Sequence, residues 1–359
     1  MKTILSSKTC HRLVGFGIFL IVITFIAVIT GCGLSPIEIQ DWHDLDAIRD
    51  NMHGRYILMN DLDSTTAGYD ELASPTANEG KGWQPIGSTA ANDAFVGSFD
   101  GRDHEIRDLS IDRPDESDVG LFGVVEVGGV IENIGAVNGS VTGYKDVGSL
   151  VGYDRGTVRN SYARGNVTGD LNVGSLLGVN GGTVGNSHSE GSVTGRDGVG
   201  GLVGRNEGTV SNSYSIDTVS GNHFVGNLVG VNSGTVSSSY AGGTVNGNSF
   251  VGGLVGGNEG VVSKCYSTGS VAGDQYAGGL VGRNLYGVVS DSFWNTQTSG
   301  QGASAGGTGK NTTEMKDVDT FSGGGWDIVA VGGSGERNTG CVWNVVDDVT
   351  YPFLSWQPL

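Results

Sequence analysis

Proline, cysteine and charged residues are all scarce in this 359-residue chain. Proline occurs only 6 times, which excludes a collagen-like segment or a proline-rich linker. Charged residues make up 16%, below the ~25% of a typical soluble domain. Of the 4 cysteines, Cys10 and Cys32 belong to the N-terminal leader, so only Cys265 and Cys341 remain, and the sequence does not decide whether they pair. Glycine occurs 65 times, and the apolar residues between the glycines recur at fixed spacing, which argues against disorder.

The patterns that mark common catalytic sites are also missing. No histidine lies in a His-Glu-x-x-His arrangement, no Gly-x-Ser-x-Gly elbow joins a strand to a helix, and calcium repeats of the Gly-Gly-x-Gly-x-Asp type are not matched. Two acidic pairs, Asp61 with Asp63 and Asp100 with Asp103, have the composition of a calcium site or a glycosidase carboxylate pair. Neighbours of this kind more often make turns and caps. We therefore predict no catalytic, cofactor-binding or metal site and no enzyme activity, with calcium as an open alternative.

The formal net charge is −18. Such a surface repels nucleic acid and anionic lipid head groups, so neither is expected as a direct partner. Two explanations of the negative charge remain. It keeps the protein soluble, or it attracts divalent cations or basic partners.

The first 31 residues have the organisation of a secretory signal. Basic residues precede an apolar run at 13–29, and Thr30-Gly31-Cys32 follows. Ile29 to Cys32 resembles the lipobox of bacterial lipoproteins, and the resemblance implies lipid attachment at Cys32 and a membrane anchor. The alternative is an uncleaved anchor, since 17 or 18 apolar residues lie at the lower limit for spanning a bilayer. Both interpretations place the rest in the cell envelope, at the outer membrane or cell surface.

A repeat of 26 residues dominates the rest of the chain. The pattern Val-Gly-Gly-Leu-Val-Gly and its variants begin at Val147, Val173, Val199, Val225, Val251 and Ala277. Each unit offers three short β-like runs between glycine turns. One unit cannot offset the conformational entropy of ordering itself, whereas stacked units share ladder hydrogen bonds and one core. The sequence predicts an all-β fold: a parallel β-helix, or β-solenoid, with ~26-residue coils, right-handed by the usual strand crossover, and a short N-terminal capping helix.

Two polar columns follow the same repeat. The first consists of asparagines at the turn after the Leu-Val-Gly run, which we expect to form an amide ladder and less readily a ligand stripe: Asn180, Asn206, Asn232, Asn258 and Asn284, with Asp154 at the preceding position. The second varies in charge from coil to coil and is a possible ligand stripe or a solvent-exposed row: Asp170, Arg196, Asn222, Asn248 and Asp274.

Residues 199–210 resemble the GLUG motif, named for a Gly-Leu-hydrophobic-Gly core that is Gly201-Leu202-Val203-Gly204 in this unit. The motif occurs in tandem in bacterial and archaeal surface proteins, including adhesin-like proteins and some secreted peptidases. The resemblance covers 119–295 and implies a surface or adhesion role. The missing His-Glu-x-x-His pattern keeps it from extending to peptidase catalysis.

We expect four segments: a lipoprotein signal peptide at 1–31, an N-terminal cap with irregular first coils at 32–118, the repeat β-helix at 119–295, and a C-terminal loop with an aromatic cap at 296–359. Residues 41–54 read as a helix capped by Asp41, 69–82 as a loop, and 296–311 as a flexible excursion. The late aromatics are expected to cap the core or, less readily, to bind sugar: Trp326, Trp343, Tyr351, Phe353 and Trp356.

The function predicted from these observations is a non-enzymatic envelope lipoprotein that acts as an adhesion or surface-interaction module. Its partners would be the membrane, through the lipid, and a glycan or extracellular protein. The alternatives are a carbohydrate-active β-helix enzyme that binds polysaccharide along the coils, and a structural spacer of the envelope.

Overall fold

The computed structural model describes residues 35–90 and 93–357, and the chain divides into two units, Met1–Ser35 and Pro36–Leu359. The predicted signal peptide and Cys32 lie outside the described residues. No helix within 35–90 or 93–357 is long and apolar enough to cross a membrane.

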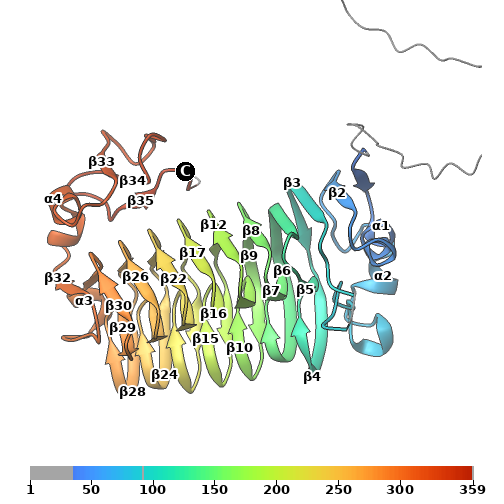
Figure 1. Cartoon of the computed structure of the whole chain (residues 1–359), viewed down its shortest axis with the longest axis horizontal. Coiled ribbons are helices and arrows are strands. Elements are labelled where there is room, and N and C mark those ends of the chain that lie inside the picture. Colours follow the sequence, from blue (N-terminus) through green and yellow to red (C-terminus); the bar gives the residue numbers. More distant parts are fainter. Residues whose placement is uncertain (1–34, 91–92, 358–359) are drawn as a thin grey trace, which may run out of the picture. The chain divides into compact units, whose positions relative to one another are not determined.

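The second unit is a stack of parallel β-coils, and the predicted solenoid is confirmed (Figure 1). Equivalent residues of successive coils pair in register, as in Val203 with Val229 and Val229 with Val255. A complete coil contributes four or five strands rather than the three expected runs. The additional strands are as short as Tyr214–Ser215, and strands of that length leave no visible apolar run in the sequence.

One face of the solenoid is a sheet of seven strands: β5 Phe122–Val125, β7 Val151–Asp154, β11 Leu177–Asn180, β16 Val203–Asn206, β21 Val229–Asn232, β25 Val255–Asn258 and β29 Val281–Asn284. The remaining coil strands belong to a larger sheet. After the seven-stranded face the chain continues through β8 Thr157–Arg159, β12 Thr183–Gly185, β17 Thr209–Ser211, β22 Thr235–Ser237, β26 Val261–Ser263 and β30 Val288–Ser290.

The next strands of each coil are β9 Tyr162–Thr168, β13 His188–Ser189, β18 Tyr214–Ser215, β23 Tyr240–Ala241, β27 Tyr266–Ser267 and β31 Phe293–Asn295, then β14 Ser192–Thr194 and β19 Thr218–Ser220. The coils close through β10 Leu171–Gly174, β15 Asp197–Gly200, β20 His223–Gly226, β24 Thr244–Gly252 and β28 Val271–Gly278. The longer β3 Ser98–Arg107, β4 Ser110–Val119 and β6 Val130–Val147 form the first coils.

The motif glycines allow two strands to fold back on each other at a sharp corner. A side chain at Gly204 would collide with the backbone of Asn172 in the preceding coil, and one at Gly200 would collide with the Val203 carbonyl. The valine and leucine columns between these glycines are buried and form one continuous core from the N-terminal cap to Trp294. The glycines therefore fix the cross-section and the apolar columns fill it.

The N-terminal cap covers the first coils with short helices. Asp41 caps α1 Trp42–Asp46 as predicted, by accepting the Asp44 amide at 2.9 Å. The expected helix over 41–54 was too long: η1 Ala47–Asp50 ends it, and 51–54 turns into β2 Arg55–Leu58, which pairs with β1 Ile37–Ile39. The expected loop at 69–82 contains α2 Tyr69–Leu72 and η2 Asn78–Gly80.

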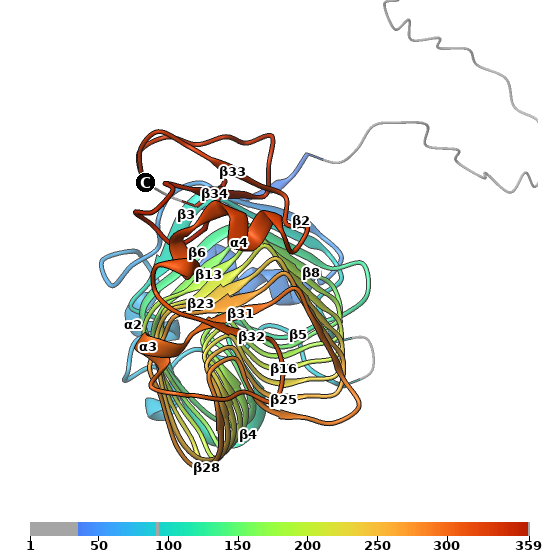
Figure 2. The ribbon, with the colours of Figure 1, turned by 90° about the vertical axis from the view of Figure 1, so that its left-hand side faces the viewer.

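After the last complete coil, the segment expected as a flexible excursion is instead built into the stack. It contains α3 Thr296–Ser299 and β32 Thr308–Lys310, which pairs in parallel with β31. A lobe at 312–357 follows, formed by η3 Glu314–Lys316, α4 Val318–Ser322, β33 Ile328–Ala330, β34 Trp343–Val345 and β35 Phe353–Leu354. Both views place this C-terminal lobe along one side of the coils and not over their end (Figures 1 and 2).

The side covered by the C-terminal lobe carries an aromatic ladder: Tyr162, His188, Tyr214, Tyr240, Tyr266 and Phe293. Neighbouring rings from Tyr162 to Tyr266 stack with centroids 4.8–5.0 Å apart. Trp343 packs on Tyr266, and Trp356 packs on Tyr214 and donates its indole N–H to Asn212 O at 3.0 Å. The late aromatics thus cover the side of the ladder.

Candidate functional site

One corner of every coil carries a residue in the left-handed backbone conformation. We call this row the corner column: Asp118, Asp146, Asn172, Gly198, Phe224, Phe250 and Tyr276, with φ between 51° and 68°. Asp, Asn and Gly tolerate this conformation, whereas a bulky side chain in it is an outlier that costs about 1–3 kcal/mol. Three consecutive aromatic residues in such positions point to a role other than backbone geometry.

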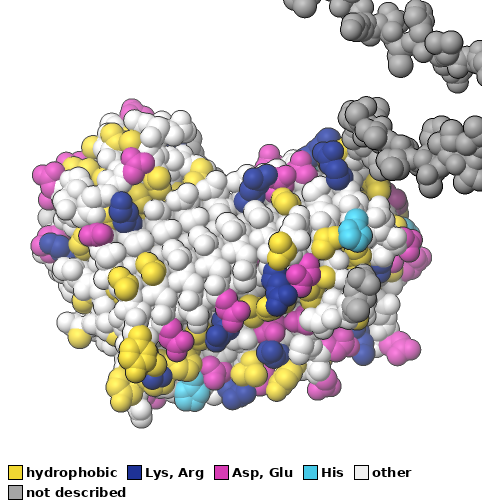
Figure 3. Space-filling view, in the orientation of Figure 1, with side chains coloured by type: hydrophobic (Ala, Val, Ile, Leu, Met, Phe, Trp, Pro, Cys, Tyr) yellow, Lys and Arg dark blue, Asp and Glu magenta, His cyan; other side chains and the backbone are white. Residues whose placement is uncertain are grey.

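The aromatic end of the corner column reaches solvent, with Phe224 and Phe250 half-buried and Tyr276 exposed. Phe224 stacks on Phe250 with centroids 4.8 Å apart, and Phe250 stacks on Tyr276 at 5.2 Å. The Arg283 guanidinium lies 5.1 Å from the Phe250 centroid, in a cation–π position, and Tyr276 is 67% exposed. In Figure 3 a patch of hydrophobic side chains lies over the coils of β24 and β28, on a face that is otherwise mostly neutral or charged.

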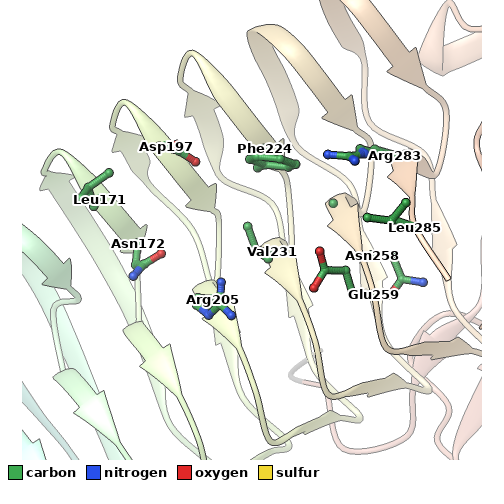
Figure 4. A pocket seen from close by; sticks show the side chains of 11 residues that line it. Leu171, Asn172, Asp197, Arg205, Phe224, Val231, Asn258, Glu259, Arg283 and Leu285 are labelled. Carbon is green, nitrogen blue, oxygen red and sulfur yellow. The ribbon is translucent and has the colours of Figure 1, made fainter. Parts of the chain in front are cut away.

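A pocket of about 260 Å³ opens beside this aromatic stack (Figure 4). Phe224 lines it together with Val231 and Leu285, and polar side chains surround them: Asn172, Asp197, Arg205, Asn258, Glu259 and Arg283. Polar side chains thus outnumber apolar ones around the pocket, which suits a small polar molecule that also has an apolar face.

The other end of the corner column is acidic. Asp118 and Asp146 line a larger pocket of about 660 Å³ together with Glu126, Lys145 and Arg155. Burial, followed by the negative charge of Asp146, raises the pKa of Asp118 to about 6. Lys145 pairs with Asp146 at 3.3 Å, and Arg155 pairs with Glu126 at 3.1 Å. Two carboxyl groups on successive coils in one cleft are the arrangement that a carbohydrate-active enzyme would need.

The stripe predicted as a possible ligand surface lies two residues before the corner column in each coil. Arg196 donates to both Asp170 oxygens, at 2.7 and 2.9 Å, and this hydrogen bonding lowers the pKa of Asp170. The Asn248 amide is 3.5 Å from Asn222 Oδ1, and Asp274 is exposed. The stripe therefore borders the corner column, and its part in binding stays a prediction.

The asparagine column lies inside the solenoid rather than on its surface. Each amide N–H donates to Oδ1 of the next coil at 2.7–2.8 Å, in an unbroken run from Asn180 to Asn284. The same amides also reach backbone carbonyls, as from Asn206 to Thr235 O at 3.2 Å. Asn180, Asn206 and Asn232 are fully buried, so these side chains hold coils together and offer no surface to a ligand.

Asp154 occupies the first position of the asparagine column and makes fewer side-chain hydrogen bonds than the asparagines that follow it. Its Oδ1 accepts the Gly156 amide at 3.0 Å, just as Asn180 Oδ1 accepts the Gly182 amide. Its Oδ2 takes the place of an amide nitrogen and has no hydrogen-bond partner among the described residues. Burial raises the pKa of Asp154 to about 7, because the ionised carboxylate is poorly solvated there.

The acidic pairs named from the sequence serve turns. Asp63 accepts the Thr65 amide at 2.8 Å, and Asp100 accepts the Arg102 amide at 2.9 Å. Asp61 contacts the His104 ring at 3.1 Å. Across the described residues no group of three or more His, Cys, Asp or Glu side chains is arranged to hold a metal ion. Cys265 and Cys341 are both free.

Comparison with known proteins identifies the repeat. Residues 195–220 match the model of the GLUG motif. The chain therefore contains the GLUG motif. The resemblance inferred from Gly201-Leu202-Val203-Gly204 is thus confirmed, and the GLUG unit coincides with the coil that carries the sharp glycine corner.

Two curated relatives share part of the chain. Halomucin of Haloquadratum walsbyi is 42% identical over 140 residues, which are 37% of this chain and 2% of Halomucin. A protein of Evansella cellulosilytica named as a Gly-rich membrane protein is 30% identical over 131 residues, 35% of this chain and 14% of that protein. This chain therefore spans only a small part of both relatives.

A crystal structure from Bacteroides ovatus, described as an immunoglobulin A1 protease, has 18% sequence identity and a TM-score of 0.47, over 90% of this chain and 93% of that one. No activity or substrate follows from a similarity of this size.

Sequence reasoning missed the corner column, although it repeats with the same period as the named stripe. What is constant along it is a backbone conformation, while its side chains change from Asp to Asn, Gly and Phe. The only available signal was the recurrence of Phe224, Phe250 and Tyr276 at 26-residue steps.

Proposed function

We propose that this protein is a non-enzymatic adhesion or surface-interaction module of the cell envelope, anchored by lipid at Cys32. A place at the surface is supported by its relatives, one of which is named as a membrane protein. The observation that carries the proposal is the corner column, which presents strained aromatic side chains on successive coils, with Phe224 and Phe250 half-buried and Tyr276 exposed. A repeated surface of this kind adds weak contacts into avidity toward an extended partner.

The partner that fits this surface is a glycan or an extracellular protein. Nucleic acid does not fit, because the formal net charge of −18 opposes it. The core and the asparagine column vary little, whereas the corner column and its bordering stripe vary from coil to coil. The interior, which is alike from coil to coil, therefore supports a surface whose side chains can differ from coil to coil to suit the partner.

The test uses the full-length protein in a bacterial host that processes lipoproteins. Cells that carry the wild-type chain should incorporate labelled palmitate into it and should adhere to one or more immobilised probes: xylan, chitin, hyaluronan, fibronectin or collagen. Cys32→Ser should abolish both the label and the adherence, because the protein then leaves the cell surface. The host without the chain is the control.

Two results would contradict the proposal. One is adherence no stronger than that of the host alone on every probe. The other is release of reducing ends from a polysaccharide by the purified protein, with loss of that release in Asp118→Asn. The second result would establish the carbohydrate-active alternative, since Asp118 and Asp146 supply its carboxyl pair.

A further inference from the structure

The corner column has one gap. Asn172 stands on one side of Gly198 and Phe224 on the other, so the position between them carries no side chain. Coils are ~4.8 Å apart, and the two flanking residues are therefore about 9–10 Å apart along the stack. Rings within the aromatic stack lie 4.8–5.2 Å apart, so the gap has the width of one further flat ring.

Phe224 presents one face to this gap. Phe250 covers the other face at a centroid distance of 4.8 Å. The Phe224 ring also lies against Gly257, where an added Cβ would be 2.6 Å from Cδ1 of the ring. The absence of a side chain at Gly257 thus leaves room for the Phe224 ring, and stacking on Phe250 fixes the orientation of that ring. Asn172 and Asp197 line the pocket of about 260 Å³ on the gap side of Phe224, and Arg283, which lies over Phe250, lines its far end.

The rim of the gap is polar and presents both acceptors and donors. Asn172 donates its amide to Asp146 Oδ1 at 2.7 Å, which turns its own Oδ1 toward Gly198, 2.9 Å from where a Cβ would stand. Arg205 is held by Glu207 at 2.7 Å and lines the pocket. The carboxylates of Asp197 and Glu259 line the same pocket. Figure 4 shows these side chains arranged around the space beside Phe224.

We propose that the gap binds a single pyranose ring of a surface polysaccharide. This inference rests on the proposed function and names its ligand class. The C–H face of a pyranose carries partial positive charge and stacks on the electron-rich face of Phe224. Its hydroxyl groups point outward around the ring, where the carboxylates accept from them and Arg205 donates to them. An aromatic side chain of a protein would fill the same width but leave the polar rim without partners, which costs binding energy.

The volume supports one ring as the occupant. About 260 Å³ is below the ~300–1,000 Å³ of sites for larger small molecules. Asn172 and Phe224 close the gap along the column, so a bound ring that belongs to a longer chain must continue it outward, away from the coils.

The experiment measures saturation-transfer NMR on the purified full-length protein with methyl pyranosides of glucose, galactose, mannose, N-acetylglucosamine and glucuronic acid. At least one should bind to the wild type. Phe224→Asn should weaken it at least tenfold, because it removes the stacking face while keeping a residue type that the column accepts at Asn172. Gly198→Asn should abolish binding by filling the gap.

The matched control is Tyr276→Asn, which makes the same change at the opposite end of the same stack, outside the pocket. It should leave binding unchanged. The proposal is overturned if no pyranoside binds, if Tyr276→Asn abolishes binding while Phe224→Asn does not, or if N-acetyltyrosine amide binds in the gap and the sugars do not. Pyranoside binding lost in Phe224→Asn with unchanged cell adherence would keep the site and refute its role in adhesion.

Discussion

The solenoid has two rows of stacked aromatic rings, and they differ in almost everything except their spacing. The aromatic ladder lies on ordinary extended backbone, is largely buried, and is covered by the C-terminal lobe. The aromatic stack of the corner column lies on left-handed backbone and runs from half-buried Phe224 and Phe250 to exposed Tyr276. Stacking at the coil spacing is therefore no guide to role. What distinguishes the two is that the C-terminal lobe covers the aromatic ladder, whereas the aromatic residues of the corner column have a strained backbone and can reach a partner.

The largest expected effect is in the covered row. Tyr266→Ala should lower the free energy of unfolding by about 3–5 kcal/mol, because the ring packs on Trp343 and its hydroxyl donates to Pro352 O. Phe250→Asn in the open row should change it by less than about 1 kcal/mol, since lost stacking is offset by relief of strain. Urea denaturation of both variants measures the difference. Equal losses would remove the distinction between the two rows.

A smaller effect is expected from the buried asparagines. Asn206→Ala should lower the free energy of unfolding by about 1–3 kcal/mol, because it leaves Asn180 without its acceptor and Asn232 without its donor. Asn284→Ala, at the end of the row and partly exposed, should cost less. The comparison of the two melting temperatures is the measurement. If Asn284→Ala lowered the melting temperature as much as Asn206→Ala, the middle asparagines would not contribute more to stability than the terminal one.

The smallest effect depends on pH. The folded-state pKa of Asp154 is raised from 3.8 to about 7, so between these values the unfolded chain releases a proton that the folded protein keeps. The free energy of unfolding therefore falls as pH rises through this window and is level above it. Asp154→Asn should reduce that fall and should be more stable than the wild type at pH 8 by about 1 kcal/mol, because its amide can donate to Asn180.

Denaturation at pH 4 and pH 8 checks this prediction. Burial also raises the pKa of Asp217 to about 7. Because Asp217 is present in both proteins, part of the decrease in the free energy of unfolding remains in each. A wild-type and a variant curve that run parallel between the two pH values would show that Asp154 does not titrate in this range.

The solenoid and its coil length could be predicted because the inward positions repeat chemically. Val199, Leu202 and their counterparts are buried in all coils except at Ala277, so the requirement for one core leaves one pattern in the sequence. The glycine corners were visible for the same reason. Where the chain departs from the repeat, the prediction was weaker: the helix over 41–54 was too long, and the segment 296–311 is ordered by pairing with β31 rather than flexible.

The position of the C-terminal lobe could not be read from the sequence. Trp356 meets Asn212, 144 residues away, through one hydrogen bond and ring contacts that no local pattern encodes. The corner column escaped prediction for another reason: its positions share a backbone angle φ but not a side-chain type. Asn172, Gly198 and Phe224 look unrelated until the backbone shows that they occupy the same position.

The lateral position of the C-terminal lobe has a mechanical consequence. A stack in which each coil contacts only its neighbours can peel from its free end, one coil at a time. In this protein the lobe follows the last coil in the chain, yet it contacts Tyr266, Tyr240, Tyr214 and His188 on the coils before it. Pulling on the C-terminus therefore loads four coils together before any can separate. The proposed role at the cell surface would benefit from this resistance to tension.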